Sequence, residues 1–300
     1  MSAEEEAAEE VCASCGKAAV DDVTLKKCAC NLVKYCSVDC QKNHRPQHKK
    51  LCKKRLAEIR DDRLFTQPNE SHIGECPICC LPLPLDMEKS TMMSCCSKVI
   101  CNGCRYANEK REREQGLEER CLYCREPKPE TEEEYDQNHI ERVKANDPVA
   151  ICGVGKKRYS KGDLEGAIQY WTKAAALGDV ESHYELAGAY QRGDGVEKDK
   201  KKEMYHAEEA AIGGHPKARF HLSAHEVEKG RMDRSMKHLI IAAKQGDDEA
   251  LEGLKMSFQI GFVSKNEYAV ALREHQAAVD ATKSKQREEA EKAGYGRVQG

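Results

Sequence analysis

The sequence predicts small metal-stapled modules followed by an all-α solenoid of helical hairpins. Two observations lead to this fold class. Sixteen of the 17 cysteines fall between Cys12 and Cys124, a density typical of modules held together by disulfides or metal ions. Beyond them cysteine nearly disappears and a period of 32 to 36 residues begins, which indicates stacked helical repeats.

Composition narrows the classes of function. The net charge is −3 and aromatic residues make up 5% of the chain, so the whole chain is not a polyanion binder and has little material for a large apolar core. The first residues, MSAEEEAAEE, lack the basic and apolar regions of a signal peptide, and no apolar run approaches the ~18 residues of a membrane span. We therefore expect an intracellular protein, in the cytoplasm or nucleus, that binds zinc and has no membrane partner.

The first group of cysteines contains four pairs of metal-binding side chains. The pairs are Cys12/Cys15, Cys28/Cys30, Cys36/Cys40 and His48/Cys52. Residues four apart lie on one face of a helix, whereas the closer pairs bind from turns. Eight ligands suffice for two tetrahedral zinc sites. We expect Pro46 to interrupt the helix between His44 and His48, and we interpret His44 as a solvent-facing residue that is not a ligand.

The stretches CASC, CNLVKYCSVDCQ and HKKLC make this segment resemble the MYND zinc finger family. The resemblance implies interleaved ligands, with one zinc ion on Cys12, Cys15, Cys36 and Cys40, and a second on Cys28, Cys30, His48 and Cys52. We expect this finger over residues 12–60, after an acidic disordered tail over 1–11. Its basic segment, 41–60, is interpreted as a solvated helical face, and the alternative is a patch that binds phosphate or an acidic peptide. No aromatic residue interleaves the basic ones there, so nucleic acid is not an expected partner.

A second array of thiols spans residues 76–125. Its pairs are Cys76/Cys79, Cys95/Cys96, Cys101/Cys104 and Cys121/Cys124, which raises the expected metal content to about four zinc ions per chain. Cys80 is spare. The sequence leaves open which of Cys79 or Cys80, and which of Cys95 or Cys96, reaches metal. A short helix ending before Pro68 should precede the array.

The motifs CPIC, ICNGC and CLYCR make this array resemble an all-cysteine variant of the RING finger family. The resemblance implies a cross-brace, with one zinc ion on Cys76, Cys79, Cys101 and Cys104 and the other on Cys95, Cys96, Cys121 and Cys124. It also implies contacts to a ubiquitin-conjugating enzyme from Ile78 and Arg125. We expect this module over residues 61–128.

Residues 147–282 are predicted to form four helical hairpins. Gly178, Gly214 and Gly246 each follow an Ala pair and should end the second helix of successive hairpins. Small residues in the same register mark the first helices, where they let helices approach closely: Ala150, Ser182, Ala218 and Ala250. The stretch LAGAYQRGDGV resembles the Sel-like repeat family, a relative of tetratricopeptide repeats.

Helix caps and tails complete the expected organisation. A linker helix over 129–146 should begin at Thr131, and Ser264 with Glu267 should form a capping box on the last helix of the stack. A charged tail over 283–300 should follow. The sequence shows no hydrolytic triad, cofactor loop or paired catalytic carboxylates, so no catalytic residue is assigned.

Two functions from different classes fit these features. The first is a zinc-binding adaptor whose fingers and repeats bind protein or peptide partners. The alternative is a RING-type ubiquitin ligase, which docks a conjugating enzyme, has no nucleophile of its own and uses the repeats to recruit substrate. The fold alone does not decide between them.

Overall fold

A computed structural model describes residues 11–19 and 24–295 of the 300-residue chain. The predicted acidic tail therefore lies outside the described residues except for Val11, and so do residues 296–300 of the predicted charged tail. The chain divides into two compact units, Met1–Thr66 and Gln67–Gly300. In the described part of the chain, no helix combines the length and the apolar character that a membrane crossing requires.

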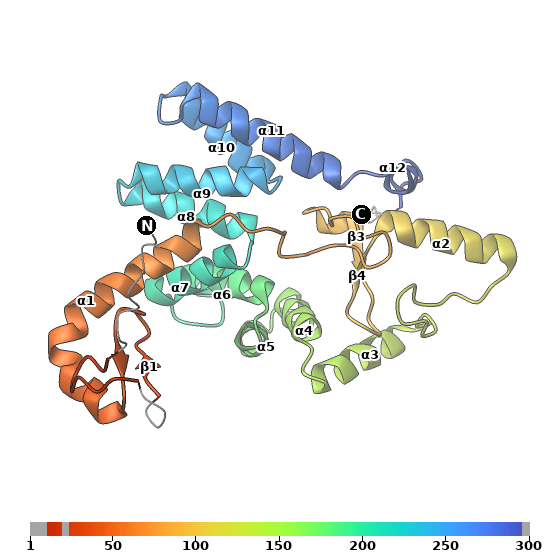
Figure 1. Ribbon diagram of the computed structural model, residues 1–300. Coiled ribbons are helices and arrows are strands. Elements are labelled where there is room, and N and C mark those ends of the chain that lie inside the picture. Colours follow the sequence, from red (N-terminus) through yellow and green to blue (C-terminus); the bar gives the residue numbers. More distant parts are fainter. Residues whose placement is uncertain (1–10, 20–23, 296–300) are drawn as a thin grey trace, which may run out of the picture. The chain divides into compact units, whose positions relative to one another are not determined.

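The first unit consists of a short hairpin and one long helix (Figure 1). Strands β1 (Lys26–Lys27) and β2 (Lys34–Tyr35) pair antiparallel, and helix α1 runs over Val38–Phe65. Ser37 starts α1, because its hydroxyl accepts a hydrogen bond of 3.1 Å from the backbone N–H of Cys40. The buried residues beside the hairpin are three cysteines and one aromatic, Cys12, Cys28, Cys30 and Tyr35. Such a small core depends on its thiols.

Pro46 does not interrupt α1, so the prediction of a broken helix was wrong. A proline inside a helix lacks one backbone donor and ordinarily costs about 3 kcal/mol. Here α1 carries Cys40 before Pro46 and His48 and Cys52 after it, and these side chains belong to two metal-binding clusters. We attribute the continuity of the helix to this anchoring on both sides. The predicted separate helix before Pro68 is the last part of α1.

The second unit begins with the second thiol-rich module. Strands β3 (Ser90–Met92) and β4 (Val99–Cys101) pair antiparallel after a short 3-10 turn, η1 (Met87–Lys89), and helix α2 (Asn102–Gln115) follows. Gly116 ends α2 in a left-handed conformation with φ 61°. Apart from cysteines, the buried core of the module is Leu83 and Ile100. This module also has little apolar material of its own.

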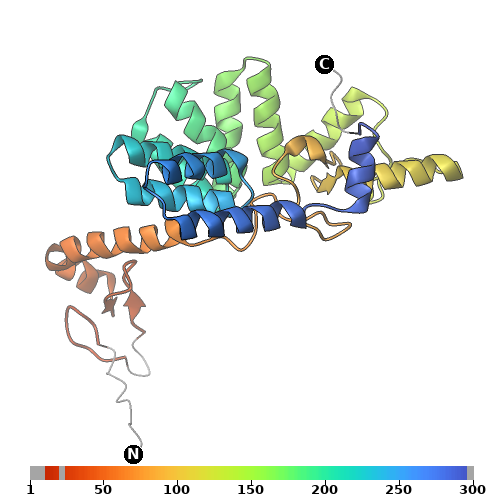
Figure 2. The ribbon, with the colours of Figure 1, turned by 90° about the horizontal axis from the view of Figure 1, so that it is seen from above.

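The rest of the second unit is a stack of antiparallel helical hairpins, introduced by helix α3 (Glu132–Lys144) (Figures 1 and 2). In chain order the hairpins are α4 (Pro148–Ser160) with α5 (Leu164–Ala176), α6 (Val180–Arg192) with α7 (Lys200–Ile212), α8 (Pro216–Glu228) with α9 (Met232–Lys244), and α10 (Asp248–Gln259) with α11 (Lys265–Ala281). The predicted fold class, metal-stapled modules followed by a helical repeat solenoid, is confirmed.

The predicted register of the repeat is also confirmed. Gly178, Gly214 and Gly246 have φ values of 90°, 89° and 91°, so the same left-handed turn joins successive hairpins. The four small residues of the first helices are fully buried: Ala150, Ser182, Ala218 and Ala250. Thr131 caps α3, and Ser264 with Glu267 forms the capping box of α11, as expected.

Both ends of the solenoid contact the second thiol-rich module (Figures 1 and 2). At the first end, the amide of Asn138 in α3 donates to the Ser94 hydroxyl at 3.3 Å, and Met92 of β3 lies against Gly153 of α4. At the other end, the segment predicted as a charged tail contains helix α12 (Lys285–Lys292), which packs on α2. This packing was not predicted from the sequence. The chain thus leaves the module through α3 and returns to it through α12.

Candidate metal centres

Metal-binding side chains gather into clusters in the described residues, with ligand atoms within 4.8 Å of one another. Four clusters have the membership that the two resemblances imply. We number them in chain order: site 1 is Cys12, Cys15, Cys36 and Cys40; site 2 is Cys28, Cys30, His48 and Cys52; site 3 is Cys76, Cys79, Cys101 and Cys104; site 4 is Cys95, Cys96, Cys121 and Cys124. Each site combines pairs that are separated in the sequence by other ligands.

One turn conformation presents many of these thiols. In the turn that starts at Cys12, the Cys12 N–H donates to the carbonyl of Lys17 at 2.8 Å, and the Gly16 N–H donates to the carbonyl of Cys12 at 2.9 Å. The turns that start at Cys76 and Cys121 have the same two bonds. The fifth residue of each turn has a positive φ: Gly16 at 73°, Cys80 at 54° and Arg125 at 66°. The first and fourth residues of the turn supply the ligands.

This turn decides between Cys79 and Cys80. Cys79 is the fourth residue of its turn and lies in site 3, with its Sγ 3.9 Å from that of Cys101. Cys80 is the fifth, occupies the left-handed position and is exposed outside the cluster. The backbone conformation of the turn therefore keeps the spare thiol away from the other sulfurs.

The adjacent pair Cys95 and Cys96 uses the same turn differently. The turn starts at Met93, whose N–H donates to the carbonyl of Lys98 at 2.9 Å, and Ser97 has the positive φ of 56°. Its third and fourth residues, Cys95 and Cys96, both lie in site 4. Their sulfurs are 3.3 Å and 3.8 Å from those of Cys124 and Cys121, respectively. The structure thus brings both members of the pair into the cluster.

The spacing of the sulfurs fits zinc. A zinc–sulfur distance of about 2.3 Å gives a tetrahedron whose edge is about 3.8 Å. The Sγ···Sγ distance is 3.5 Å for Cys15 and Cys36 in site 1, and 3.7 Å for Cys28 and Cys52 in site 2. Site 3 has the 3.9 Å distance given above, site 4 has the 3.3 and 3.8 Å distances, and all 17 cysteines are free thiols. Thiolate-rich tetrahedral sets are typical of structural zinc, so the chain is built to hold several zinc ions.

The electrostatics of the clusters also call for a cation. Hydrogen bonding by the Cys101 thiol, with further bonds from backbone N–H groups, lowers the pKa of Cys76 to about 4. Hydrogen bonding by the backbone N–H of Cys36 lowers the pKa of Cys12 to about 6. Other members shift the opposite way: burial raises the pKa of Cys104 to about 12. One thiolate is therefore favoured and further negative charge is opposed until a divalent cation binds, displacing the remaining protons.

His44 lies beside site 2 without belonging to it. Its Nδ1 is 3.0 Å from the hydroxyl of Tyr35, and its ring stacks on that of His48 with centroids 5.7 Å apart. His48 Nε2 lies 3.1 Å from the sulfur of Cys30 inside the cluster. His44 thus lies outside the clusters, as expected, but it is half-buried and hydrogen-bonded and not simply solvent-facing.

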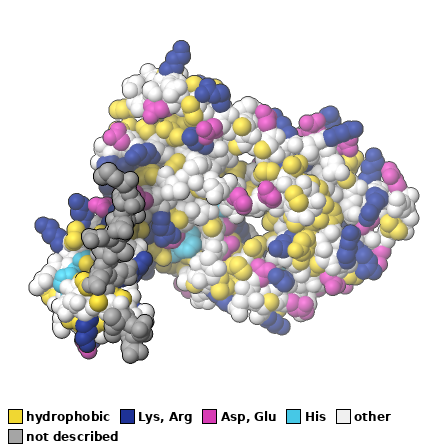
Figure 3. Space-filling model, in the orientation of Figure 1, with side chains coloured by type: hydrophobic (Ala, Val, Ile, Leu, Met, Phe, Trp, Pro, Cys, Tyr) yellow, Lys and Arg dark blue, Asp and Glu magenta, His cyan; other side chains and the backbone are white. Residues whose placement is uncertain are grey.

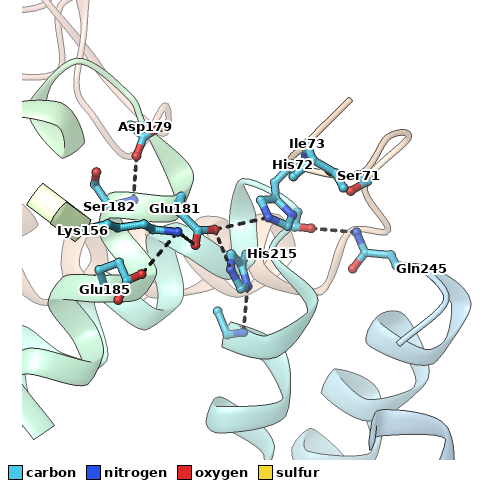
Figure 4. A network of polar contacts seen from close by, with 12 residues as sticks. Ser71, His72, Ile73, Lys156, Asp179, Glu181, Ser182, Glu185, His215 and Gln245 are labelled. Carbon is cyan, nitrogen blue, oxygen red and sulfur yellow. Dashed lines mark hydrogen bonds and ion pairs between the residues drawn. The ribbon is translucent and has the colours of Figure 1, made fainter. Parts of the chain in front are cut away.

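A fifth cluster joins His72, Glu181 and His215, which come from three distant segments (Figure 4). His215 Nε2 is 3.2 Å and His72 Nε2 is 3.5 Å from Glu181 Oε2, while Lys156 pairs with Oε1 of the same carboxylate. The rings of His72 and His215 stack with centroids 4.3 Å apart. No local spacing in the sequence could have indicated this group.

The hydrogen bonds of His215 favour a polar junction over a metal site for this fifth cluster. His215 caps α8, because its Nδ1 accepts the N–H of Ala218 at 3.2 Å. The ring proton therefore sits on Nε2 and is donated to Glu181. A metal ion on Nε2 would move that proton to Nδ1, against the Ala218 N–H. Burial alone raises the pKa of Glu181, but hydrogen bonds from His215 and His72 lower it well below its usual range. The junction fastens the segment around His72 to α6 and α8.

The two residues expected to contact a conjugating enzyme lie on turns at opposite ends of the second module's sequence. Ile78, in the turn that starts at Cys76, is 41% exposed. Arg125 follows Cys124, and its carbonyl accepts a hydrogen bond of 3.1 Å from Arg120. Tyr123, in the same turn, is 49% exposed. These turns therefore present Ile78 beside site 3 and Tyr123 beside site 4.

Comparisons with known proteins agree with part of this picture. The family described as MYND finger matches residues 12–52. Among curated proteins, none matches this sequence. A solved Sel1 repeat protein from Oxalobacter formigenes is 20% identical over 59% of this chain and 73% of its own, with a TM-score of 0.44. A protective antigen with an SLR fold from uropathogenic Escherichia coli strains is 16% identical over 57% of this chain and 37% of its own, with a TM-score of 0.39.

This chain thus spans little more than a third of the length of the second of these structures. The MYND match coincides with the segment that supplies the ligands of sites 1 and 2. Helical hairpins make up residues 148–281, and the second thiol-rich module lies between these two parts of the sequence. The chain therefore combines an N-terminal segment that is similar to the MYND finger family with a second thiol-rich module and a helical repeat solenoid.

Proposed function

We propose that this chain is a zinc-binding adaptor that binds protein partners through its zinc modules and its solenoid. The observation that carries the proposal is an apolar turn at residues 256–262, where α10 ends. Met256, Ile260 and Phe262 are 60%, 70% and 52% exposed there. Figure 3 shows apolar side chains over the part of the solenoid formed by α10 and α11. Contiguous large apolar side chains on a surface are typical of protein-binding sites.

The apolar turn is also well ordered by its own contacts. The ring of Phe258 stacks on that of Tyr268 with centroids 5.2 Å apart and an interplanar angle of 6°. The capping box at Ser264 fixes the start of the next helix directly after the turn. The exposed side chains are therefore carried by an ordered turn, which reduces the conformational entropy lost when a partner binds.

A displayed peptide library, selected on the zinc-loaded chain, tests this proposal. We expect enriched peptides to carry apolar anchors and to lose at least about tenfold in affinity for the double variant Ile260→Ser, Phe262→Ser. The matched control is Val227→Ser, a similarly exposed apolar residue in α8 (47% exposed). Equal binding by the double variant and the wild type would remove the apolar turn from the interface.

A ubiquitin ligase is the second candidate function, and the exposure of Ile78 favours it. An apolar side chain between two zinc ligands of site 3 is a rigidly held contact for a conjugating enzyme, and Arg125 after the last ligand of site 4 is a donor for bound ubiquitin. Autoubiquitination with a panel of conjugating enzymes tests this candidate. We expect Ile78→Ala to abolish activity, Arg125→Ala to slow ubiquitin transfer, and the control Leu177→Ala, on the solenoid surface, to have no effect. If the wild type is inactive with every conjugating enzyme tested, the ligase candidate is rejected and the adaptor function remains.

A further inference from the structure

The C-terminal helix α12 lies directly on the part of the second module that forms site 3 (Figures 1 and 2). Ala290 is 1% exposed in this contact, and Lys89 pairs with Glu291 at 3.2 Å. Beyond the helix, the ring of Tyr295 meets that of Tyr106 edge-on, with centroids 5.6 Å apart. The helix is therefore fastened along its length to α2 and to the segment before β3.

The start of α12 approaches the backbone of α2 at Gly103. A side chain at Gly103 would place its Cβ 2.6 Å from the backbone nitrogen of Arg287 and 2.8 Å from its Cα. Only glycine leaves room for this approach. Gly103 immediately precedes Cys104, a member of site 3, so the close approach brings Arg287 to the edge of that site.

The Arg287 guanidinium points at a sulfur of site 3. Its Nη2 lies 3.5 Å from Sγ of Cys79 and donates to the carbonyl of Leu81 at 3.3 Å. Its Nη1 donates to the carbonyls of Pro82 and Thr282 at 2.7 and 2.6 Å. Backbone carbonyls from both the turn of site 3 and the end of α11 thus hold the group in place. The fork of an arginine is suited to such simultaneous bonds.

The net charge of the zinc-loaded site 3 explains why a positively charged side chain such as Arg287 is favourable beside it. Four thiolates around one divalent zinc ion leave a net charge of −2, and these sulfurs are largely buried. A guanidinium donating to Cys79 partly neutralises that charge and holds the sulfur in its place in the cluster. Neighbours of this kind typically change metal affinity 10–100-fold.

We propose that Arg287 is a positioning residue of site 3, so that this site releases its zinc more slowly while the bond between Arg287 of the docked helix α12 and Cys79 is in place. The inference rests on the proposed zinc ligands of site 3. It adds that a helix some 200 residues away along the chain completes the site, since Arg287 and Cys79 are 208 positions apart.

The first test uses the full chain loaded with zinc, and Arg287→Lys, which keeps the charge but loses the fork. We expect roughly tenfold faster transfer of one of about four zinc ions to a chelator. Alkylation followed by mass spectrometry should identify Cys79 and Cys101 as the thiols released first. The matched control is Lys285→Met, an exposed position of the same helix, which should release metal like the wild type.

Cobalt substitution separates a direct bond from a structural role. The sulfur-to-cobalt charge-transfer band reports donation to a bound thiolate, so its position should shift in Arg287→Lys and not in Lys285→Met. Gly103→Ala is the second variant: alanine favours the helix α2 locally, yet its Cβ must push α12 away while Arg287 remains present. It should also speed the loss of metal from site 3.

The outcomes are distinct. Faster metal loss and a shifted band, with α12 still protected from hydrogen exchange, support the role of Arg287. If zinc is released faster only in variants whose α12 has lost protection from hydrogen exchange, the effect belongs to the helix alone and the role of Arg287 is overturned. Unchanged zinc release in both Arg287→Lys and Gly103→Ala overturns it as well. If Cys79 and Cys101 of the wild type alkylate before any zinc is removed, the proposed ligands of site 3 fail and the inference fails with them. Binding by the apolar turn is unaffected by any of these results.

Discussion

The two thiol-rich modules contain the same number of ligands and use the same turn, but they are supported differently. In the first module a single helix, α1, contributes Cys40 to site 1 and both His48 and Cys52 to site 2, so one element ties the two sites together within its own unit. In the second module the helix α2 contributes only to site 3. Its remaining support comes from α3 and α12, at the two ends of the solenoid.

This difference shows two ways of stabilising a module with almost no aliphatic core. The first uses a long helix that belongs to the module, and its metal ions are expected to hold it independently. The second shares its surface with the helical repeats. Metal binding there should therefore be coupled to the stability of the solenoid's two ends, whereas metal binding in the first module should not.

Removal of all metal should have the largest effect. Structural zinc contributes about 10–16 kcal/mol of apparent binding free energy per site in small modules. We expect a strong chelator to unfold both modules and to release α12, while most of the helical circular dichroism survives, because α4–α11 bury their apolar faces against one another. Hydrogen exchange resolves the regions. Loss of protection throughout α6–α9 together with the modules would contradict this separation.

Single ligand substitutions sharpen the comparison. Cys30 and Cys101 are both almost fully buried, at 0% and 1% exposure. Cys30→Ser should unfold the first unit and leave the thermal transition of the second unchanged. Cys101→Ser should destabilise the second module and also lower protection in α12 and in the α10–α11 hairpin. Identical effects of the two substitutions on the solenoid would show that the modules do not differ as described.

A substitution within the repeats should have a moderate effect. Ala187 of α6 is completely buried, next to the equally buried Leu186. Ala187→Leu overpacks the contact between hairpins, which typically costs ~1–3 kcal/mol of unfolding free energy. The effect should spread to adjacent hairpins while sites 1 and 2 keep their zinc. Gln191→Leu, at an exposed position of the same helix, is the control. If Ala187→Leu leaves the thermal unfolding transition of the second unit unchanged, the tight packing at Ala187 is contradicted.

Acidification should have the smallest effect among these tests. Burial, followed by the neighbouring His183, lowers the pKa of His206 to about 4. Since the unfolded chain binds this proton first as the pH falls below ~6.5, the stabilising contribution of neutral His206 is complete above that pH and is lost toward pH 4. We expect the wild type to lose about 1 kcal/mol more than His206→Gln between pH 7 and 5. Lys202 and Glu209 also face this ring. The wild type and His206→Gln have the same candidate zinc ligands. The difference between their losses of unfolding free energy therefore reports on His206.

The sequence predicted what depends on local spacing. Ligand pairs a few residues apart reflect the turn or helix that carries them, and the Ala and Gly positions of the repeat reflect the contacts between neighbouring helices. The choice between Cys79 and Cys80 needed the backbone conformation of the turn, which spacing alone does not contain. Pro46 was misjudged because the local helix penalty was considered without the ligands that anchor both sides of it.

Contacts between distant segments could not be predicted. Arg287 reaches Cys79 across 208 positions, and His72, Glu181 and His215 meet from three segments without any periodicity that links them. The charged composition of residues 283–300 is typical of a tail. A single buried alanine, Ala290, does not produce a sequence pattern from which its packing could be predicted. Such contacts follow from the folded arrangement of the whole second unit.

The return of the chain through α12 restricts how many hairpins this solenoid can contain. In an open array each hairpin contacts only its neighbours, so hairpins can be gained or lost at little cost. Here the first hairpin is attached to the second module through α3 and the last through α12. Inserting one more hairpin would carry α12 away by the width of a helix layer, about 8–10 Å, far beyond the reach of Arg287 to Cys79. Natural length variation in this protein should therefore fall in loops, such as the one between α6 and α7, and the number of hairpins should stay fixed.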